Sequence, residues 1–131
     1  MLERCPELSV IGIAVLAGYR WVINARGYAN VLASPSHNVY GVLYTITDTD
    51  ERILDRCEGV PIAYQKKKLE VTDLDGNGTT ALVYVDPSER MGKPRPDYVT
   101  KIYAGLKDAH LPVEWVQENI IPWVGLAALS V

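Results

Sequence analysis

The stretch of sequence that decides the fold reads Leu54-Asp55-Arg56-Cys57-Glu58-Gly59-Val60-Pro61. Cap-forming residues precede it, with Asp48 three positions before Glu51 as in a capping box. We therefore expect a short helix from about Asp48 to Cys57. Gly59 suits the left-handed conformation that follows many helices, and Pro61 prevents the helix from resuming. The stretch predicts a helix that ends on a carboxylate.

Glu58 is the carboxylate at that end of the predicted helix. The negative end of the helix dipole disfavours a second negative charge, so this position tends to raise the pKa of a glutamate. Glu58 is therefore the first candidate for proton transfer. The alternative is a surface residue paired with Arg56 or with a lysine of the next strand. On the residues alone that alternative is the commoner arrangement, because perturbed carboxylates are a minority.

The 131 residues form one predicted domain with an ordinary apolar content of 48%. A net charge of -3 gives no electrostatic case for nucleic acid or an anionic membrane. Cys5 and Cys57 are too few and too far apart for a disulfide framework. No signal peptide is recognised, and the longest apolar stretches, 10–17 and 120–131, are too short to span a membrane. We expect a soluble cytoplasmic protein.

The order of predicted elements gives the fold class. Short strands are expected first, at 10–16, 19–24, 28–32 and 39–46, the third ended by Ser34-Pro35-Ser36. The segment 39–46 is apolar on both faces and is predicted to be central, with Gly41 marking a bulge, a bend or a close approach to the backbone. The strands 63–72 and 80–85 flank a predicted hairpin turn, and helices follow at 97–109 and 112–119. This order predicts an α+β fold with a mostly antiparallel, strongly curved or closed β-barrel flanked by α-helices.

Several other motifs do not predict a metal-binding or catalytic site. Residues 73–78 match the first half of a calcium-binding loop but lack its final glutamate, so a hairpin is favoured. His37 and His110 occupy turn-like sequence without metal-site spacing, so neither zinc nor another metal is predicted. Neither a nucleophile elbow nor a phosphate-binding glycine loop is recognised. The run Lys66-Lys67-Lys68 is interpreted as a solvated strand edge.

Taken together, several segments resemble the gamma-glutamylcyclotransferase-like family. They occur in the family's order over most of the chain, and the specific part is a Gly-Val-Leu-Tyr strand followed by Leu-Asp-x-x-Glu-Gly and a tyrosine. The matching pieces are Gly18-Tyr19-Arg20, Tyr28-Ala29-Asn30-Val31, Val39-Tyr40-Gly41-Val42-Leu43-Tyr44, residues 54–61 with Tyr64, and Pro96-Asp97-Tyr98 followed by Ile102 and Gly105.

The resemblance implies a cofactor-free reaction on a small-molecule γ-glutamyl substrate. The α-amine of the γ-glutamyl group attacks its own γ-carbonyl and releases 5-oxoproline with a free amine or amino acid. Glu58 falls on the family's catalytic glutamate, which accepts and then donates a proton. Tyr98 falls on a family tyrosine that helps to hold the substrate, and we place Tyr64 and Gly41 at the substrate site as well. Their alternatives are a half-buried helix-opening aromatic for Tyr98 and a cross-strand packing residue for Tyr64.

The start of the chain departs from the family's pattern. Family members begin with a strand and a Tyr-Gly-Ser-Asn loop that holds the glutamyl end of the substrate. Residues 1–6 resemble the helix after that loop, so we expect the first strand and the loop to be missing. The apolar C-terminal tail 120–131 is expected either to cover the resulting gap or to mediate self-association, for example as a homodimer. The alternative function is an inactive family-like binding or interaction module.

Overall fold

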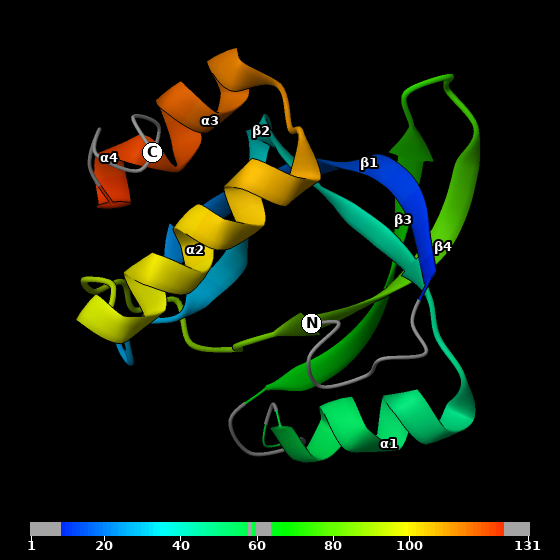
Figure 1. The fold of residues 1–131 in the computed structure, drawn as a ribbon, viewed down its shortest axis with the longest axis horizontal. Helices are drawn as coiled ribbons and strands as arrows, with labels where there is room; N and C mark the ends of the chain where they lie inside the picture. The colour runs from blue at the N-terminus through cyan, green and yellow to red at the C-terminus, as the bar shows by residue number, and fades with distance from the viewer. Residues whose placement is uncertain (1–8, 58, 60–63, 125–131) are drawn as a thin grey trace.

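The computed structural model describes residues 9–57, 59 and 64–124, which form two hairpins and four helices (Figure 1). The first hairpin joins β1 (Ser9–Ile23) to β2 (Ala29–Thr45), and the second joins β3 (Gln65–Asp73) to β4 (Gly78–Val85). Helix α1 (Asp48–Cys57) connects the two hairpins. The chain continues into α2 (Pro96–Ala109), α3 (Val113–Asn119) and α4 (Ile121–Val124). The predicted α+β class is confirmed.

The four strands form one antiparallel sheet in the order β2-β1-β3-β4. The two hairpins are joined by only two residue pairs, Ala14 with Asp73 and Val15 with Thr72. Within the described residues no ladder connects β2 with β4, so hydrogen bonds do not close the sheet. The sheet curves around an interior that α1 and α2 flank (Figure 1). The expectation of a closed barrel is therefore not confirmed, whereas the antiparallel sheet with flanking helices is.

The first hairpin differs from the prediction in the continuity of its strands, in their length and in the place of β2 in the sheet. The segments 10–16 and 19–24 belong to the single strand β1, and β2 does not end at Ser34-Pro35-Ser36. Instead the register shifts there, because Ala17 pairs with Asn38 whereas Tyr19 pairs with Ala33. Proline is tolerated because β2 is an edge strand, which also makes the predicted central position of 39–46 wrong. Gly41 pairs regularly with Ala14, so a bulge, one of the three alternatives for Gly41, is absent from this ladder.

Helix α1 spans the predicted residues, but its cap lies one position earlier than predicted. Thr47 and Asp50 form the reciprocal pair: the Asp50 N–H donates to Thr47 Oγ1 at 3.1 Å, and the Thr47 N–H donates to Asp50 Oδ2 at 3.2 Å. Gly59 follows the helix with φ of 65°. Buried Leu54 packs the helix against the sheet. Local sequence therefore fixes both ends of α1.

A cluster of charged side chains and one tyrosine connects α1 with the second hairpin. The Lys66 ammonium lies 2.6 Å from Glu51 Oε2 and 2.9 Å from Asp55 Oδ2, and the Tyr84 hydroxyl donates to Asp55 Oδ1 at 2.7 Å. The Tyr84 hydrogen bond, followed by Lys66, lowers the pKa of Asp55, and the two carboxylates raise the pKa of Lys66. The lysine run is exposed, as interpreted from the sequence, and Lys66 in addition pairs with two carboxylates of α1.

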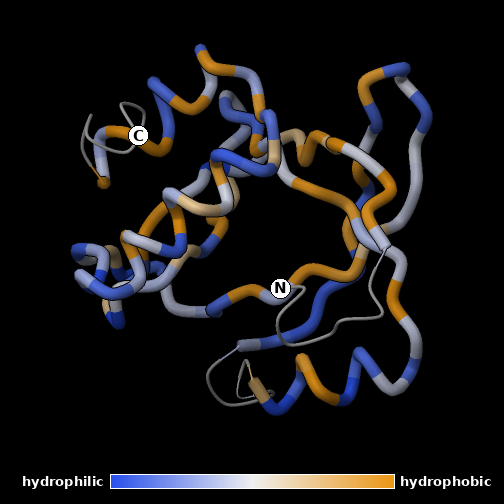
Figure 2. Tube along the Cα trace, viewed as in Figure 1, coloured by the Kyte–Doolittle hydropathy of each residue, from blue (hydrophilic) through white to orange (hydrophobic). Residues whose placement is uncertain are grey.

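The main core lies where the C-terminal helices cover the sheet. Trp115 donates from Nε1 to the Asn38 carbonyl at 2.7 Å, and Ile120 and Ile121 are buried beside it. Hydrophobic and hydrophilic positions alternate along α2, whose half-buried side packs on the same core (Figure 2). The start of the predicted tail thus packs against its own domain, and 125–131 lie outside the described residues. No helix in the described ranges is long and apolar enough to cross a membrane.

Candidate active site

A cavity of about 840 Å³ lies on the inner face of the sheet. Its apolar lining comes from core residues of all four strands, among them Ala14, Leu16, Val39, Val71 and Ala81. Its polar lining comes from the turn after β1, the end of α1 and the first turns of α2. An apolar cavity with polar groups gathered at one side has the composition of a small-molecule site.

The described candidate site residues all line this one cavity. Gly41, Tyr64 and Tyr98 come from β2, the entry to β3 and α2, and the fold brings them together. Glu58 lies outside the described residues, but its described neighbours Cys57 and Gly59 are both on the lining. Segments that the sequence singled out separately therefore border the same cavity.

Gly41 borders open space. A Cβ atom built on Gly41 would meet no atom within 4 Å, and its backbone has no left-handed strain. Neither packing nor conformation therefore requires glycine here. Of the three interpretations offered by the sequence, an approach by another group to the backbone is the one that fits a residue on the wall of the cavity.

Tyr64 and Tyr98 hold the backbone of the same residue, Ala29. The Tyr64 hydroxyl donates to the Ala29 carbonyl at 3.2 Å, and the Ala29 N–H donates to the Tyr98 hydroxyl at 3.3 Å. Tyr98 also meets Tyr28 edge to face, with ring centroids 5.1 Å apart. Tyr64 is buried rather than exposed on a strand. Each tyrosine thus has a structural role in shaping the wall of the cavity.

Asn24 is fully buried behind Tyr64 and connects it to Asp86. Its amide donates to the Tyr64 hydroxyl at 3.1 Å and to Asp86 Oδ2 at 3.0 Å. Its Oδ1 accepts the backbone N–H groups of Arg26 and Tyr28, both at 3.0 Å. Every hydrogen-bonding group of this side chain is used, which makes the network rigid. The sequence indicated Asn24 only as a turn residue, because its partners are distant along the chain.

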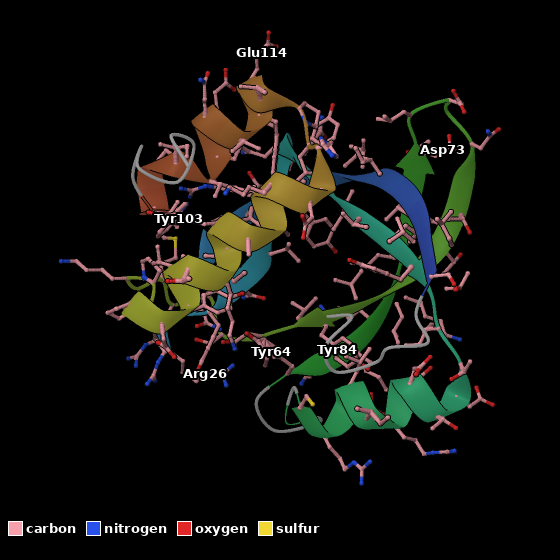
Figure 3. All side chains as sticks on the ribbon, viewed as in Figure 1. Arg26, Tyr64, Asp73, Tyr84, Tyr103 and Glu114 are labelled. Carbon is pink, nitrogen blue, oxygen red and sulfur yellow. The ribbon has the colours of Figure 1, made fainter. Side chains whose placement is uncertain are left out.

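Positive side chains gather on the polar side of the cavity, and sequence reasoning missed them. Arg26 forms an ion pair with Asp86 at 3.2 Å, and its guanidinium lies 5.0 Å from the centroid of the Tyr64 ring. Figure 3 shows Arg26 and Tyr64 close together at this side of the molecule. Arg56 and Lys101 complete the positive lining. In the sequence Arg56 lies two residues before Glu58, and Lys101 lies three residues after Tyr98. These short separations alone do not predict that either charge lines a site.

Neither histidine belongs to this site. His37 Nδ1 lies 2.7 Å from Ser34 Oγ, and His110 ends α2 in a left-handed conformation. Among the described residues no group of three or more histidine, cysteine or acidic side chains could hold a metal ion.

The AIG2-like family matches residues 38–118, which is more than half of the chain. The chain therefore belongs to the AIG2-like family. The relatives that it matches include gamma-glutamylcyclotransferases of Homo sapiens and Mus musculus, each 28% identical over 93 residues. Each match covers 70% of this chain and 50% of the relative, so the chain spans about half the length of these curated relatives.

Solved structures share the fold. A gamma-glutamyl cyclotransferase superposes with a TM-score of 0.80 at 23% identity, covering 89% of this chain and 76% of that chain. An uncharacterized Homo sapiens protein gives 0.80 at 24% identity with the same coverage, and YkqA of Bacillus subtilis gives 0.72 at 25% identity, covering 84% of this chain and 42% of that chain. The resemblance seen in the sequence is confirmed at the level of the family and the fold.

Proposed function

We propose that this protein is a gamma-glutamylcyclotransferase-like enzyme that releases 5-oxoproline from a γ-glutamyl compound. The observation that carries the proposal is the convergence of Gly41, Tyr64, Tyr98 and the two neighbours of Glu58 on one cavity. Membership of the AIG2-like family and the gamma-glutamylcyclotransferase relatives support the same reaction class.

The proposed reaction is intramolecular and redox-neutral. Glu58 accepts a proton from the α-ammonium of the γ-glutamyl group, and the freed amine attacks the γ-carbonyl to form a new C–N bond. Collapse of the tetrahedral intermediate breaks the original amide bond, and the protonated Glu58 donates its proton to the leaving nitrogen. Glu58 then carries the second proton that the ring nitrogen loses to the released amine, which leaves as an ammonium ion. The products are 5-oxoproline and the amine or amino acid. No cofactor takes part in this scheme.

The cavity walls support such a reaction by restricting the substrate. Cyclisation requires the α-amine and the γ-carbonyl to meet, so a site that holds the chain folded removes much of the entropic barrier. Tyr64 and Tyr98 supply a rigid wall, because both hydroxyls are bonded to Ala29. Gly41 leaves room on the wall of the cavity for the substrate.

The test is release of 5-oxoproline from a panel of γ-glutamyl amino acids and γ-glutamyl amines. We expect turnover by the 131-residue chain and its loss in Glu58→Gln, which keeps the shape of the side chain but cannot shuttle the proton. Glu114→Gln is the matched control, because Glu114 is exposed on α3 away from the cavity (Figure 3). Undiminished release by Glu58→Gln would disprove the role of Glu58. Binding without release would instead favour the inactive binding module.

A further inference from the structure

A second cavity, of about 380 Å³, lies between the first hairpin and the C-terminal helices. Its volume is within the range of sites for small molecules. It shares no described residue with the cavity of the candidate active site, so a ligand bound here would leave that site free. The described lining comes from β1, β2, α3 and α4, and consists of Arg20, His37, Glu118, Asn119, Pro122 and Trp123.

A bulge in β2 brings His37 to this cavity. The register shift in the first hairpin leaves residues 34–37 of β2 facing the single residue Gly18 of β1, whose φ of 80° favours glycine. The Nδ1 atom of His37 lies 2.7 Å from Ser34 Oγ, a contact that fixes the imidazole ring. When Nδ1 accepts the Ser34 hydroxyl, Nε2 carries the ring proton and is the donor available to a ligand.

Arg20 and Glu118 place opposite charges on the lining. The Arg20 guanidinium lies over the ring of Trp123, 5.9 Å from its centroid. Among residues 9–57, 59 and 64–124, neither Arg20 nor Glu118 has an ion-pair partner within 4.0 Å, so the two groups do not neutralise each other. Opposite charges that line one cavity without meeting can each bind a group of a ligand that carries both signs.

The remaining polar atoms follow the same division. Asn119 donates from Nδ2 to the Trp115 carbonyl at 3.0 Å, so its Oδ1 atom is the one left to accept a hydrogen bond. The acceptors, Asn119 and Glu118, therefore come from α3, and the donors, Arg20 and His37, come from the strands. A phosphate would be repelled by Glu118, and a simple cation would be repelled by Arg20.

We infer that this second cavity binds a free α-amino acid in its zwitterionic form. The carboxylate of the ligand meets Arg20, and its ammonium group meets Glu118. Pro122 and Trp123 supply the apolar surface of the lining, so an apolar side chain on the ligand is favoured. The inference does not rest on the proposed cyclotransferase reaction, because the two cavities have no described residue in common.

Three probes with the same side chain separate the two charges. L-Leucine carries both charges, L-leucinamide lacks the carboxylate, and isocaproate lacks the ammonium group. NMR titration follows the indole resonance of Trp123, which Trp123→Phe identifies and which does not belong to the active-site cavity. We expect L-leucine to bind about 3- to 5-fold more tightly than either analogue, the contribution of one solvent-exposed ion pair.

Variants assign each charge of the ligand to a residue. Arg20→Gln should remove the preference for L-leucine over L-leucinamide and keep the preference over isocaproate, and Glu118→Gln should do the reverse. A merely structural role would weaken the binding of all three probes alike. Arg52→Gln and Glu114→Gln are the matched controls, because both residues are exposed and lie outside the described lining of this cavity.

The unmodified protein alone can overturn the inference. A Trp123 resonance that does not respond to L-leucine would do so, as would an analogue that binds as tightly as L-leucine, since the site would then recognise a single charge. Preferences unaltered in both glutamine variants would also overturn it. Binding of L-leucine by a chain that releases no 5-oxoproline would support this inference and refute the proposed function, and release without such binding would do the opposite.

Discussion

The carboxamide of Asn30 pairs with both backbone groups of Asp86. Asn30 Nδ2 donates to the Asp86 carbonyl at 3.1 Å, and the Asp86 N–H donates to Asn30 Oδ1 at 2.9 Å. Asn30 lies near the start of β2, and Asp86 directly follows β4. One side chain therefore joins the two outer strands of the sheet at a place where no ladder joins them within the described residues.

Asn30→Ala should destabilise the protein strongly. The substitution leaves an N–H and a C=O of Asp86 without partners, and both lie in a buried region. Each unsatisfied buried group costs about 1–3 kcal/mol, so we expect the free energy of unfolding to fall by about 3 kcal/mol. Urea denaturation measures this change. Asn38→Ala, an exposed position on the same strand, is the control and should stay within about 0.5 kcal/mol.

Tyr64→Phe should cost more stability than Tyr98→Phe. Removing the Tyr64 hydroxyl leaves both the buried Asn24 amide and the Ala29 carbonyl short of a partner, whereas removing the Tyr98 hydroxyl affects the Ala29 N–H. We expect a loss of about 2–3 kcal/mol for Tyr64→Phe and about 1 kcal/mol for Tyr98→Phe. Thermal and urea unfolding measure both. Equal losses would show that the bond to Asn24 contributes nothing, and Tyr19→Phe removes a hydroxyl outside this network as a control.

Gly41→Val should reduce activity without reducing stability. A Cβ atom added at Gly41 meets no atom within 4 Å, and valine replaces a flexible residue in a strand, so the free energy of unfolding should stay the same or rise by about 0.5–1 kcal/mol. It also occupies the wall of the cavity, and we expect kcat/KM for a γ-glutamyl substrate to fall by about 10-fold or more. Gly105→Ala is the control, because Gly105 has similar free space and is not on the lining. Full activity in Gly41→Val would place the substrate elsewhere.

The free energy of unfolding should depend on pH through the charged cluster that joins α1 to the second hairpin. Asp55 has a pKa below its ordinary value of 3.8, so its contribution is present above that value and is lost as the pH falls through the folded-state pKa. Lys66 has a pKa above 10.5, so its contribution is complete below that value and is lost as the pH rises through the folded-state pKa. The cluster therefore stabilises the fold between these two limits.

Asp55→Asn should weaken both the acid and the alkaline dependence of stability, since Asp55 also helps to raise the pKa of Lys66. Asp73 provides the comparison. Its pKa is lowered chiefly by the backbone N–H of Asn77, and no lysine takes part. Asp73→Asn should therefore weaken the acid dependence alone. Urea unfolding across the pH range distinguishes the two variants, and identical profiles would contradict the assigned contacts.

Local signals predicted the helices well because their causes lie within a few residues. The limits of α1 follow from the cap residues before it and from Gly59 after it, all of which can be recognised in the sequence. The length of β2 could not be predicted in this way. Pro35 ends a strand by its local preference, but pairing with β1 continues on both sides of it, and that pairing depends on the partner strand.

The family resemblance supplied most positions of the candidate site, whereas Glu58 was also indicated by its place at a helix end and Gly41 by its place within a strand. The resemblance assigned Tyr64, Tyr98 and Gly41 to a substrate site, and the fold brings all three onto one cavity. The groups that hold them were missed because the hydrogen bonds join residues far apart in sequence: Asn24 and Tyr64 are 40 positions apart, and Ala29 and Tyr98 are 69 positions apart. No periodicity or spacing rule acts over such separations.

The two hydrogen bonds on Ala29 have a mechanical consequence. Helix α2 has no fully buried residue, and the bond between Tyr98 and the Ala29 N–H is one of the contacts that position its first turns, together with the edge-to-face contact between Tyr98 and Tyr28. The carbonyl of the same residue is held by Tyr64 at the entry to β3. A tilt of α2 that keeps the bond from Ala29 to Tyr98 would displace the main chain at the start of β2, where Tyr64 is bonded to the carbonyl of the same residue. Ala29 thus connects α2 with the entry to β3. The hydrogen-exchange rate of its amide measures how often the bond to Tyr98 on α2 opens.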